Sequence, residues 1–455
     1  MAWVAQETWQ RSRTHDSLAP STTISMTANP LPENPTPDVR VIDGPVAGGV
    51  HSQVPATTRR PRIDSVDLLR GIVMVIMLLD HTRDFTHWAV TAFDPTNVER
   101  TWPALFFTRW ITHFCAPLFV FLAGTGAYLQ LSRGRSKADL SAFLVKRGLW
   151  LIVLEFTLVR FLVTFEYDLS FLGMAQVIWV LGVSMIVLGA LVRLPLRAIA
   201  IFGIAMIALH NLLDPISVAV WQGPGSAVPD GFSKLWMVLH DGGAFPVAGW
   251  PSPVLFVLYP LIPWIGVMAA GYALGRVYDW EPARRQRFLL RVGAALTIGF
   301  ILLRATNLYG DPSPWSTQPS GVYTLLSFLN VTKYPPSLLF LLMTIGPGLM
   351  ALAWFERMRT GKIASPLVVF GRVPLFFYVL QWLTAHTLGI VAHMIAGKPW
   401  SQFVGGGFGP WPEGAGFGLG VTYLVWIVGV LLLYPICKWY AGVKQRRNDW
   451  WLSYM

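Results

Sequence analysis

Residues 67–84 read DLLRGIVMVIMLLDHTRD, and this stretch decides how the rest of the chain is understood. Eight consecutive apolar residues, at positions 72–79, separate Asp67 and Arg70 from a second charged group that begins at Asp80. A helix over residues 66–84 is about 28 Å long, close to the ~30 Å of bilayer hydrocarbon. Ionisable groups in such a helix are costly and usually face a cavity or a partner. The stretch therefore predicts a membrane helix with polar groups at both ends.

The rest of the chain has the same apolar character. Of its 455 residues, 54% are hydrophobic and 13% are charged, whereas a soluble domain carries about 25% charged residues. This composition excludes a disordered, fibrous or disulfide-stabilised protein, and Cys115 and Cys437 are expected to be buried free thiols. We predict an all-α, polytopic membrane bundle of ten or eleven transmembrane helices. The ten apolar runs span residues 66–84, 105–130, 143–165, 170–192, 195–214, 253–277, 287–308, 335–357, 366–394 and 416–441.

The chain is expected to divide into three parts. Residues 1–60 are rich in Pro, Thr, Ser and Ala, which predicts a disordered cytoplasmic tail. Residues 61–447 are expected to form the transmembrane domain, and residues 448–455 a short cytoplasmic tail.

Basic residues are concentrated in alternate links between the apolar runs. The link between the second and third runs is one example, and it carries Arg133, Arg135, Lys137, Lys146 and Arg147. Cytoplasmic links are the ones that carry excess Lys and Arg. The pattern predicts a multi-pass protein with both termini in the cytoplasm. We expect this protein in the cytoplasmic membrane of a bacterium. The formal net charge of +11 is explained by this orientation, so a nucleic-acid partner is not expected.

Arg70 and His81 are expected to lie on one face of the first membrane helix. They are eleven residues apart, which is about 20° beyond three full turns and about 16 Å along the axis. A cation at the inner end and a base at the outer end suit a reaction that passes a group across the membrane. Asp84, three residues after His81, is close enough to orient the imidazole. The alternatives are an anchoring role for Arg70 and an interfacial, water-bonded His81.

His113 is a second candidate base, in the run 105–130. It shares a helix face with Arg109 by i,i+4 spacing, and it is expected about two turns below the outer surface. A histidine at that depth is expected to be functional or firmly paired. No spacing typical of metal ligands stands out in the sequence, so no metal is expected.

Several motifs resemble the heparan-alpha-glucosaminide N-acetyltransferase catalytic-domain family, within a wider superfamily of transmembrane acyltransferases. The resemblance covers roughly residues 60–440. It is carried by Arg62-Ile-Asp-Ser-Val-Asp67-Leu-Leu-Arg70-Gly71, Phe114-Cys-Ala-Pro117-Leu-Phe-Val-Phe-Leu-Ala-Gly124, Gln176-Val-Ile-Trp179, Asn330-Val-Thr-Lys333-Tyr334-Pro335-Pro336 and Gly371-Arg372-Val-Pro-Leu-Phe-Phe-Tyr378.

The resemblance implies a chemistry and its partners. Acetyl-CoA would bind from the cytoplasm, and its acetyl group would reach a sugar amine or hydroxyl of an envelope glycan on the far side. A histidine would serve as base or as transient acetyl carrier. Related enzymes make a homodimer compatible with this function. The CoA phosphates would be held by cations on the cytoplasmic side, with Arg70, Lys146, Arg147 and Arg372 as candidates.

The resemblance does not directly identify the catalytic histidine of this sequence. The animal lysosomal members place their proposed histidine in the link after the first helix, before an Asn-Gly element that this sequence lacks. His87 falls in that region, and His113 stands where those enzymes have an aspartate. We rank His81 first, His113 second and His87 third.

Two other classes of protein remain as alternatives. In a proton-coupled transporter of small solutes the same histidines would relay protons or bind solute, and a membrane scaffold would use them only for packing. An enzyme should have a continuous cavity between Arg70 and His81 with a basic mouth. A transporter should have paired acidic groups near the midplane, and this sequence has few there.

Overall fold

The computed structural model describes residues 63–358, 361, 364–405, 411–447 and 449–454. It is mostly helical, with 69% helix and few strands. The expected tail at residues 1–60 lies outside the described residues. The α-helices are α2 (Asp64–Thr86), α3 (Pro103–Trp110), α4 (Cys115–Ser132), α5 (Lys137–Leu154), α6 (Arg160–Thr164), α7 (Val177–Leu191), α8 (Leu196–Leu209), α9 (Gly231–Trp236), α10 (Trp264–Leu274), α11 (Pro282–Thr306), α12 (Gly321–Leu329), α13 (Leu338–Phe355), α14 (Ala364–Arg372), α15 (Pro374–Ile395) and α16 (Leu419–Arg446). Short 3-10 and π-helical turns connect or extend them: η1 (Trp88–Thr91), η2 (Ile111–Phe114), η3 (Glu155–Val159), η4 (His210–Leu213), η5 (Met237–Asp241), η6 (Gly275–Asp279), η7 (Trp400–Phe403) and η8 (Trp450–Ser453).

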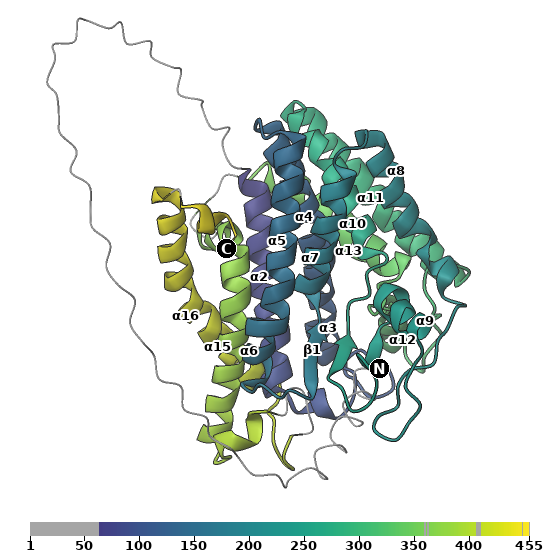
Figure 1. Cartoon of the computed structure of the whole chain (residues 1–455), viewed down its shortest axis with the longest axis vertical. Coiled ribbons are helices and arrows are strands. Elements are labelled where there is room, and N and C mark those ends of the chain that lie inside the picture. Colours follow the sequence, from purple (N-terminus) through teal and green to yellow (C-terminus); the bar gives the residue numbers. More distant parts are fainter. Residues whose placement is uncertain (1–62, 359–360, 362–363, 406–410, 448, 455) are drawn as a thin grey trace, which may run out of the picture.

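The long helices run along the longest axis of the molecule (Figure 1). Helices α2, α4, α5 and α7 form its centre, with α15 and α16 on one side and α8, α11 and α13 on the other. Helix α2 begins at one end, here called the basic end, and its last turn reaches the opposite end, here called the His81 end. The shorter elements α3, α9 and α12 lie at the His81 end (Figure 1).

Each of the ten predicted apolar runs contains helix, but the count of ten or eleven transmembrane helices is not confirmed. Within the described residues, six helices are long and apolar enough to cross a membrane: Pro103–Ser132, Leu196–Leu213, Pro282–Thr306, Leu338–Phe355, Pro374–Ile395 and Leu419–Arg446. Helix α2 has the length, but six Asp and Arg residues interrupt its apolar character. Helices α7 and α10 are too short, at 15 and 11 residues.

The all-α prediction is wrong at two of the apolar runs, which begin as strands. Strands β1 (Phe171–Ala175), β2 (Gly243–Pro246) and β3 (Val254–Val257) form a sheet in the order β1-β3-β2, with β1 parallel and β2 antiparallel to β3. Short apolar runs fit a buried strand as well as a buried helix, so periodicity alone does not separate them. Strand β1 lies toward the His81 end (Figure 1).

Helices α2 and α14 approach each other at two glycines. A Cβ atom on Gly71 would lie 1.8 Å from the carbonyl oxygen of Leu367, and one on Gly371 would lie 1.8 Å from that of Asp67. Membrane helices use such small residues because they let the backbones come close. The contact places Arg372, the last residue of α14, beside the first turns of α2.

The predicted run 366–394 is two helices rather than one. Val373 separates α14 from α15, and Pro374 occupies the first turn of α15, where proline's missing N–H costs nothing. The break ends α14 at Arg372 and starts the helix that carries Trp382 into the interior.

The final described residues pack on the bundle. Turn η8 falls in the segment 448–455 that was expected to be a tail. Leu452 in this turn is buried, and the Tyr454 ring lies 6.1 Å from that of Phe143 on α5.

Candidate active site

A cavity of about 480 Å³ runs through the centre of the bundle, and both Arg70 and His81 line it. Their common cavity confirms the geometry that was predicted from their spacing on one helix face. The walls come from α2, α4, α5, α7, α14 and α15, together with Tyr259 and Lys333 from links at the His81 end.

Cationic side chains gather at the basic end of this cavity. The lining includes Arg70, Arg133, Arg135, Arg147, Arg372 and Lys444. Arg133 and Arg135 come from the turn between α4 and α5, and Lys444 comes from the last turn of α16. Asp67 is the one carboxylate among the lining residues near Arg70, so the cations outnumber the anions at this end and favour an anionic ligand.

Hydrogen bonds and ion pairs hold two of these arginines in place. The Arg70 guanidinium donates to the carbonyl oxygen of Leu122 at 2.7 Å and lies 3.8 Å from the Asp67 carboxylate. Arg372 reaches the other oxygen of Asp67 at 4.0 Å and Asp64 at 3.5 Å. Arginine suits such a site because its planar fork can bind one group and still present donors to a phosphate.

A four-residue charge cluster lies at the His81 end. One nitrogen of Arg109 donates to both carboxylate oxygens of Asp80, at 2.8 and 2.6 Å. Arg83 lies 3.0 Å from Asp80 and donates to Asp84 at 2.5 Å. Two arginines and two aspartates leave the cluster formally neutral. Of the four, Asp80 reaches the cavity wall.

His81 is held in the cavity wall by stacking. Its ring lies 3.7 Å from the Trp382 ring, centroid to centroid, with an angle of 19° between the planes. Its Nδ1 is buried and has no hydrogen-bond partner among the described residues. The ring plane is therefore set by an aromatic contact with α15.

Four of the predicted site residues do not line the cavity: Asp84, His87, His113 and Lys146. Asp84 pairs with Arg83, and no hydrogen bond joins it to His81 within the described part of the chain. His113 is 3% exposed and packs against the ring of Phe340 at 5.4 Å. Lys146 is exposed on the outer face of α5, whereas Arg147 next to it lines the cavity.

His87 has a local role at the end of α2. Its Nδ1 accepts a hydrogen bond from the backbone N–H of Ala89 at 3.1 Å and so caps η1. Burial, assisted by the nearby Arg83 charge, lowers the pKa of His87 to about 4, so the ring stays neutral at physiological pH. The side chain is fully buried and does not reach the cavity.

The sequence reasoning missed several residues of the cavity wall. Lys333 was not singled out as a site residue, although its motif contributed to the family resemblance. Trp382 lies in an apolar helix, and no pattern in the sequence indicated that it lines a site. Arg133 and Arg135 were used only for orientation and Lys444 was not singled out, because nothing local to these residues shows that two turns so far apart in the chain meet at one mouth.

Among the described residues, no group of three or more His, Cys, Asp or Glu side chains could hold a metal ion. Both cysteines are buried free thiols, as predicted.

The apolar helices and the charged cavity define the class as an integral membrane protein with an internal cavity. The sequence profile of the family described as "Heparan-alpha-glucosaminide N-acetyltransferase, catalytic" matches residues 62–303, more than half of the chain. The chain belongs to this family of membrane acetyltransferases. No curated protein sequence matches it. The matched region includes Arg70, His81, Arg147 and the charge cluster, and it ends before Lys333 and Arg372.

Proposed function

We propose that the protein moves an acetyl group from cytoplasmic acetyl-CoA to a sugar amine or hydroxyl on the opposite side of the membrane. The observation that carries the proposal is the cavity with an excess of cations at one end and His81 at the other. A thioester bound at one end and an acceptor entering at the other would meet inside this cavity, so neither substrate would have to cross the bilayer.

The basic end fits the nucleotide part of CoA. That part carries a diphosphate and a further phosphate, which several guanidinium groups bind through charge-assisted hydrogen bonds. The same end carries the Lys- and Arg-rich links, which supports placing it in the cytoplasm, where acetyl-CoA is made. Arg70, Arg147 and Arg372 are the candidate phosphate ligands among the predicted residues. Lys146 is not, because it faces away from the cavity.

The narrow arm of CoA would then extend along α2 toward His81. Arg70 and His81 are about 16 Å apart along the helix axis, and apolar residues such as Met77, Ala116 and Phe119 line the wall in this region. These side chains would exclude water from the thioester, which protects it from hydrolysis and strengthens electrostatic interactions around it.

His81 is the proposed base. A neutral imidazole can take the proton from the acceptor amine or hydroxyl as that group attacks the thioester carbon, and then return it to the departing CoA thiolate. Stacking on Trp382 restricts rotation of the ring, and the pairing of Asp80 with Arg109 and Arg83 keeps that carboxylate from competing for the proton. A direct transfer of this kind leaves no acetyl group on the enzyme.

The decisive experiment measures transfer from radiolabelled acetyl-CoA by protein purified in detergent, with glucosamine as the first acceptor. Wild-type protein should release CoA and form labelled acetylglucosamine. His81→Ala should lower the rate by roughly 10²–10⁴, the usual contribution of a general base, and should leave the affinity for acetyl-CoA unchanged. His113→Gln is the matched control, because His113 is buried on the neighbouring helix but does not line the cavity.

Several results would change the proposal. Full activity of His81→Ala with loss in His113→Gln would move the base to His113. Label that stays on acid-quenched protein, and is absent from His81→Ala, would make His81 an acetyl carrier. Solute uptake into vesicles without CoA release would favour the proton-coupled transporter.

A further inference from the structure

The link between α12 and α13 carries one lysine into the cavity. Residues 330–337 read NVTKYPPS, and Lys333 lines the cavity together with Asp80 and His81. The side chain comes from a loop rather than from a helix, so its position depends on what holds the loop. Two buried charged residues, Asp311 and Arg304, do this.

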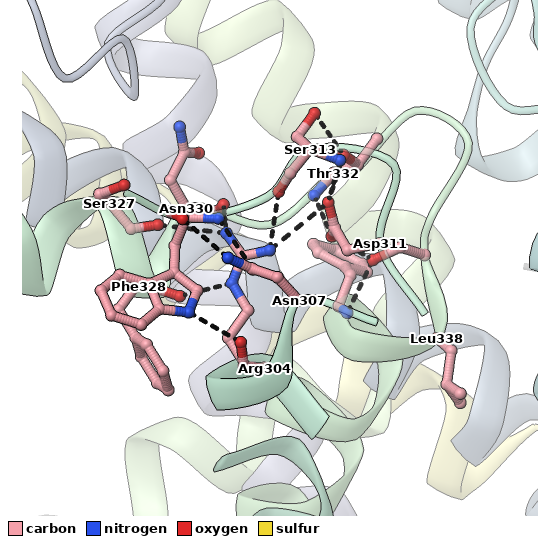
Figure 2. Close-up of polar contacts among 12 residues, drawn as sticks. Arg304, Asn307, Asp311, Ser313, Ser327, Phe328, Asn330, Thr332 and Leu338 are labelled. Carbon is pink, nitrogen blue, oxygen red and sulfur yellow. Dashed lines mark hydrogen bonds and ion pairs between the residues drawn. The ribbon is translucent and has the colours of Figure 1, made fainter. Parts of the chain in front are cut away.

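The Asp311 carboxylate binds the loop on both sides of Lys333. One of its oxygens accepts the backbone N–H of Thr332 at 2.8 Å and the hydroxyl of Ser337 at 2.7 Å. The other accepts the hydroxyl of Thr332 at 2.9 Å (Figure 2). The backbone N–H of Ser337 also donates to the carbonyl of Thr332 at 3.0 Å, which closes the loop. A single carboxylate therefore fixes the two ends of the segment that contains Lys333.

Arg304 supports the same loop from α11. It is 1% exposed and lies 3.7 Å from Asp311. Its guanidinium donates to four carbonyl oxygens, those of Ser313 at 2.7 Å, Ser327 at 3.2 Å, Phe328 at 3.0 Å and Asn330 at 2.7 Å (Figure 2). Its donors are thus used to join α11, the link after it, the end of α12 and the start of the lysine loop.

The ammonium group of Lys333 makes no ion pair with a carboxylate among the described residues. Lys333 is 9% exposed, and its Nζ lies 5.2 Å from the centroid of the ring of its neighbour Tyr334. No side-chain hydrogen bond joins the ammonium group to a residue within the described ranges. Asp80, the carboxylate in this part of the wall, is already paired with Arg109 and Arg83. A buried charge that lacks a hydrogen-bonded or ion-paired partner is costly, so a rigidly held one facing a cavity favours an anion that is supplied by the ligand.

We propose that Lys333 is a catalytic residue that stabilises the oxyanion formed on the acetyl carbonyl, with Asp311 and Arg304 positioning it. The inference rests on the proposed acetyl transfer. The acceptor nitrogen or oxygen attacks the thioester carbon and forms the new bond, and the carbonyl electron pair moves to oxygen beside Lys333. The oxyanion then collapses, the carbon–sulfur bond breaks, and the CoA thiolate leaves with the proton that His81 took from the acceptor.

The position of Lys333 at the His81 end of the cavity favours stabilisation of the oxyanion over binding of the CoA phosphates. Six other cations gather at the basic end, whereas charge develops in the reaction next to the base. A preorganised cation at that point stabilises the transition state more than the bound substrate. Its loss should therefore lower kcat rather than raise KM.

The test compares Lys333→Met, Lys333→Arg and Lys333→Ala with wild type, using acetyl-CoA and glucosamine. We expect Lys333→Met to lower kcat by roughly 10²–10³, the usual effect of losing one oxyanion donor, with unchanged affinity for acetyl-CoA. Lys333→Arg should restore part of the rate, and added ethylammonium should restore part of the rate of Lys333→Ala. Lys234→Met is the control, because Lys234 lies in α9 and does not line the cavity.

The positioning role of Asp311 has its own readout. Asp311→Asn keeps the size of the side chain but weakens its hydrogen bonds to Thr332 and Ser337, so kcat should fall while KM for acetyl-CoA stays the same. The double variant Asp311→Asn/Lys333→Met should have a kcat only slightly below that of Lys333→Met alone, because both changes remove the same ammonium group from its place. A purely structural role would instead give additive losses of activity and of melting temperature.

The outcomes separate this inference from the function on which it rests. A wild-type protein that releases no CoA with any acceptor contradicts both. An active wild type with an equally active Lys333→Met contradicts the catalytic role of Lys333 alone. If Lys333→Met changed only KM, the catalytic role of Lys333 would also be overturned. The same holds if ethylammonium did not restore any activity to Lys333→Ala.

Discussion

Arg147 and Lys146 are neighbours on α5 that face different surroundings. Successive residues of a helix point about 100° apart, so neighbours in the sequence can face different surroundings. Arg147 lines the cavity near Arg70, and Lys146 is exposed on the outer face. Of these two adjacent basic residues, Arg147 is thus a candidate CoA ligand and Lys146 is a surface charge.

This pair gives a matched test of the CoA site. We expect Arg147→Gln to raise the Kd for acetyl-CoA roughly tenfold or more, because a charge-assisted hydrogen bond contributes about 1.5–3 kcal/mol. Lys146→Gln should leave the Kd unchanged. Isothermal titration calorimetry at two salt concentrations measures both the affinity and its electrostatic part. Equal effects of the two substitutions would contradict the assignment.

At the scale of elements, the contact between α2 and α14 sets the shape of the basic mouth. Gly71 and Gly371 let the two backbones meet, which brings Arg372 within 4.0 Å of Asp67, the partner of Arg70. The break at Val373 and Pro374 lets α15 leave in its own direction and carry Trp382 to His81. Both ends of the cavity therefore depend on how α14 and α15 join.

A side chain at this contact should be strongly destabilising. Gly371→Val would place its Cβ 1.8 Å from a backbone oxygen of α2, and backbone cannot move aside as a flexible side chain can. We expect a loss of at least the roughly 1–3 kcal/mol typical of overpacked cores, seen as a lower melting temperature in detergent. Gly420→Ala on α16 is the control, since its Cβ would meet no atom within 4 Å. A melting temperature equal to that of the control would show that the helices separate without cost.

For the whole molecule, the distribution of charge predicts how it sits in the membrane. The Lys- and Arg-rich turn between α4 and α5 and the last turn of α16 meet at the basic end. The link between α11 and α12, at the other end, has no Lys or Arg between positions 305 and 320. Under the positive-inside rule we expect the basic end to face the cytoplasm.

Reporter fusions test this orientation. Green fluorescent protein fused after residue 455 should fluoresce, because that end should remain in the reducing cytoplasm. Alkaline phosphatase fused after residue 318 should be active, because the link after α11 should lie outside. The reverse pattern would put the cation-rich mouth on the side that lacks acetyl-CoA, and the proposed direction of transfer would be wrong.

Some of the site could be predicted from local spacing and some could not. Arg70 and His81 lie on one helix, so helical geometry alone places both on one face, and both line the cavity. Lys333 lies more than 250 residues from His81, and no local rule joins them. Asp84 was predicted to orient His81 from its three-residue spacing, but Arg83 competes for the same carboxylate and holds it.

The sequence by itself determined the membrane class, the family and the common face of Arg70 and His81 on α2, because these follow from apolar content, motifs and helical periodicity. Only the tertiary structure decided which histidine faces the cavity, which basic residues share its mouth, and that a loop lysine lines the same cavity as His81. It also decided that two apolar runs begin as strands. The physical reason is that burial and pairing are properties of neighbours in space. In a chain where most side chains are apolar, a sequence pattern shows that a group is buried but not what it is buried against.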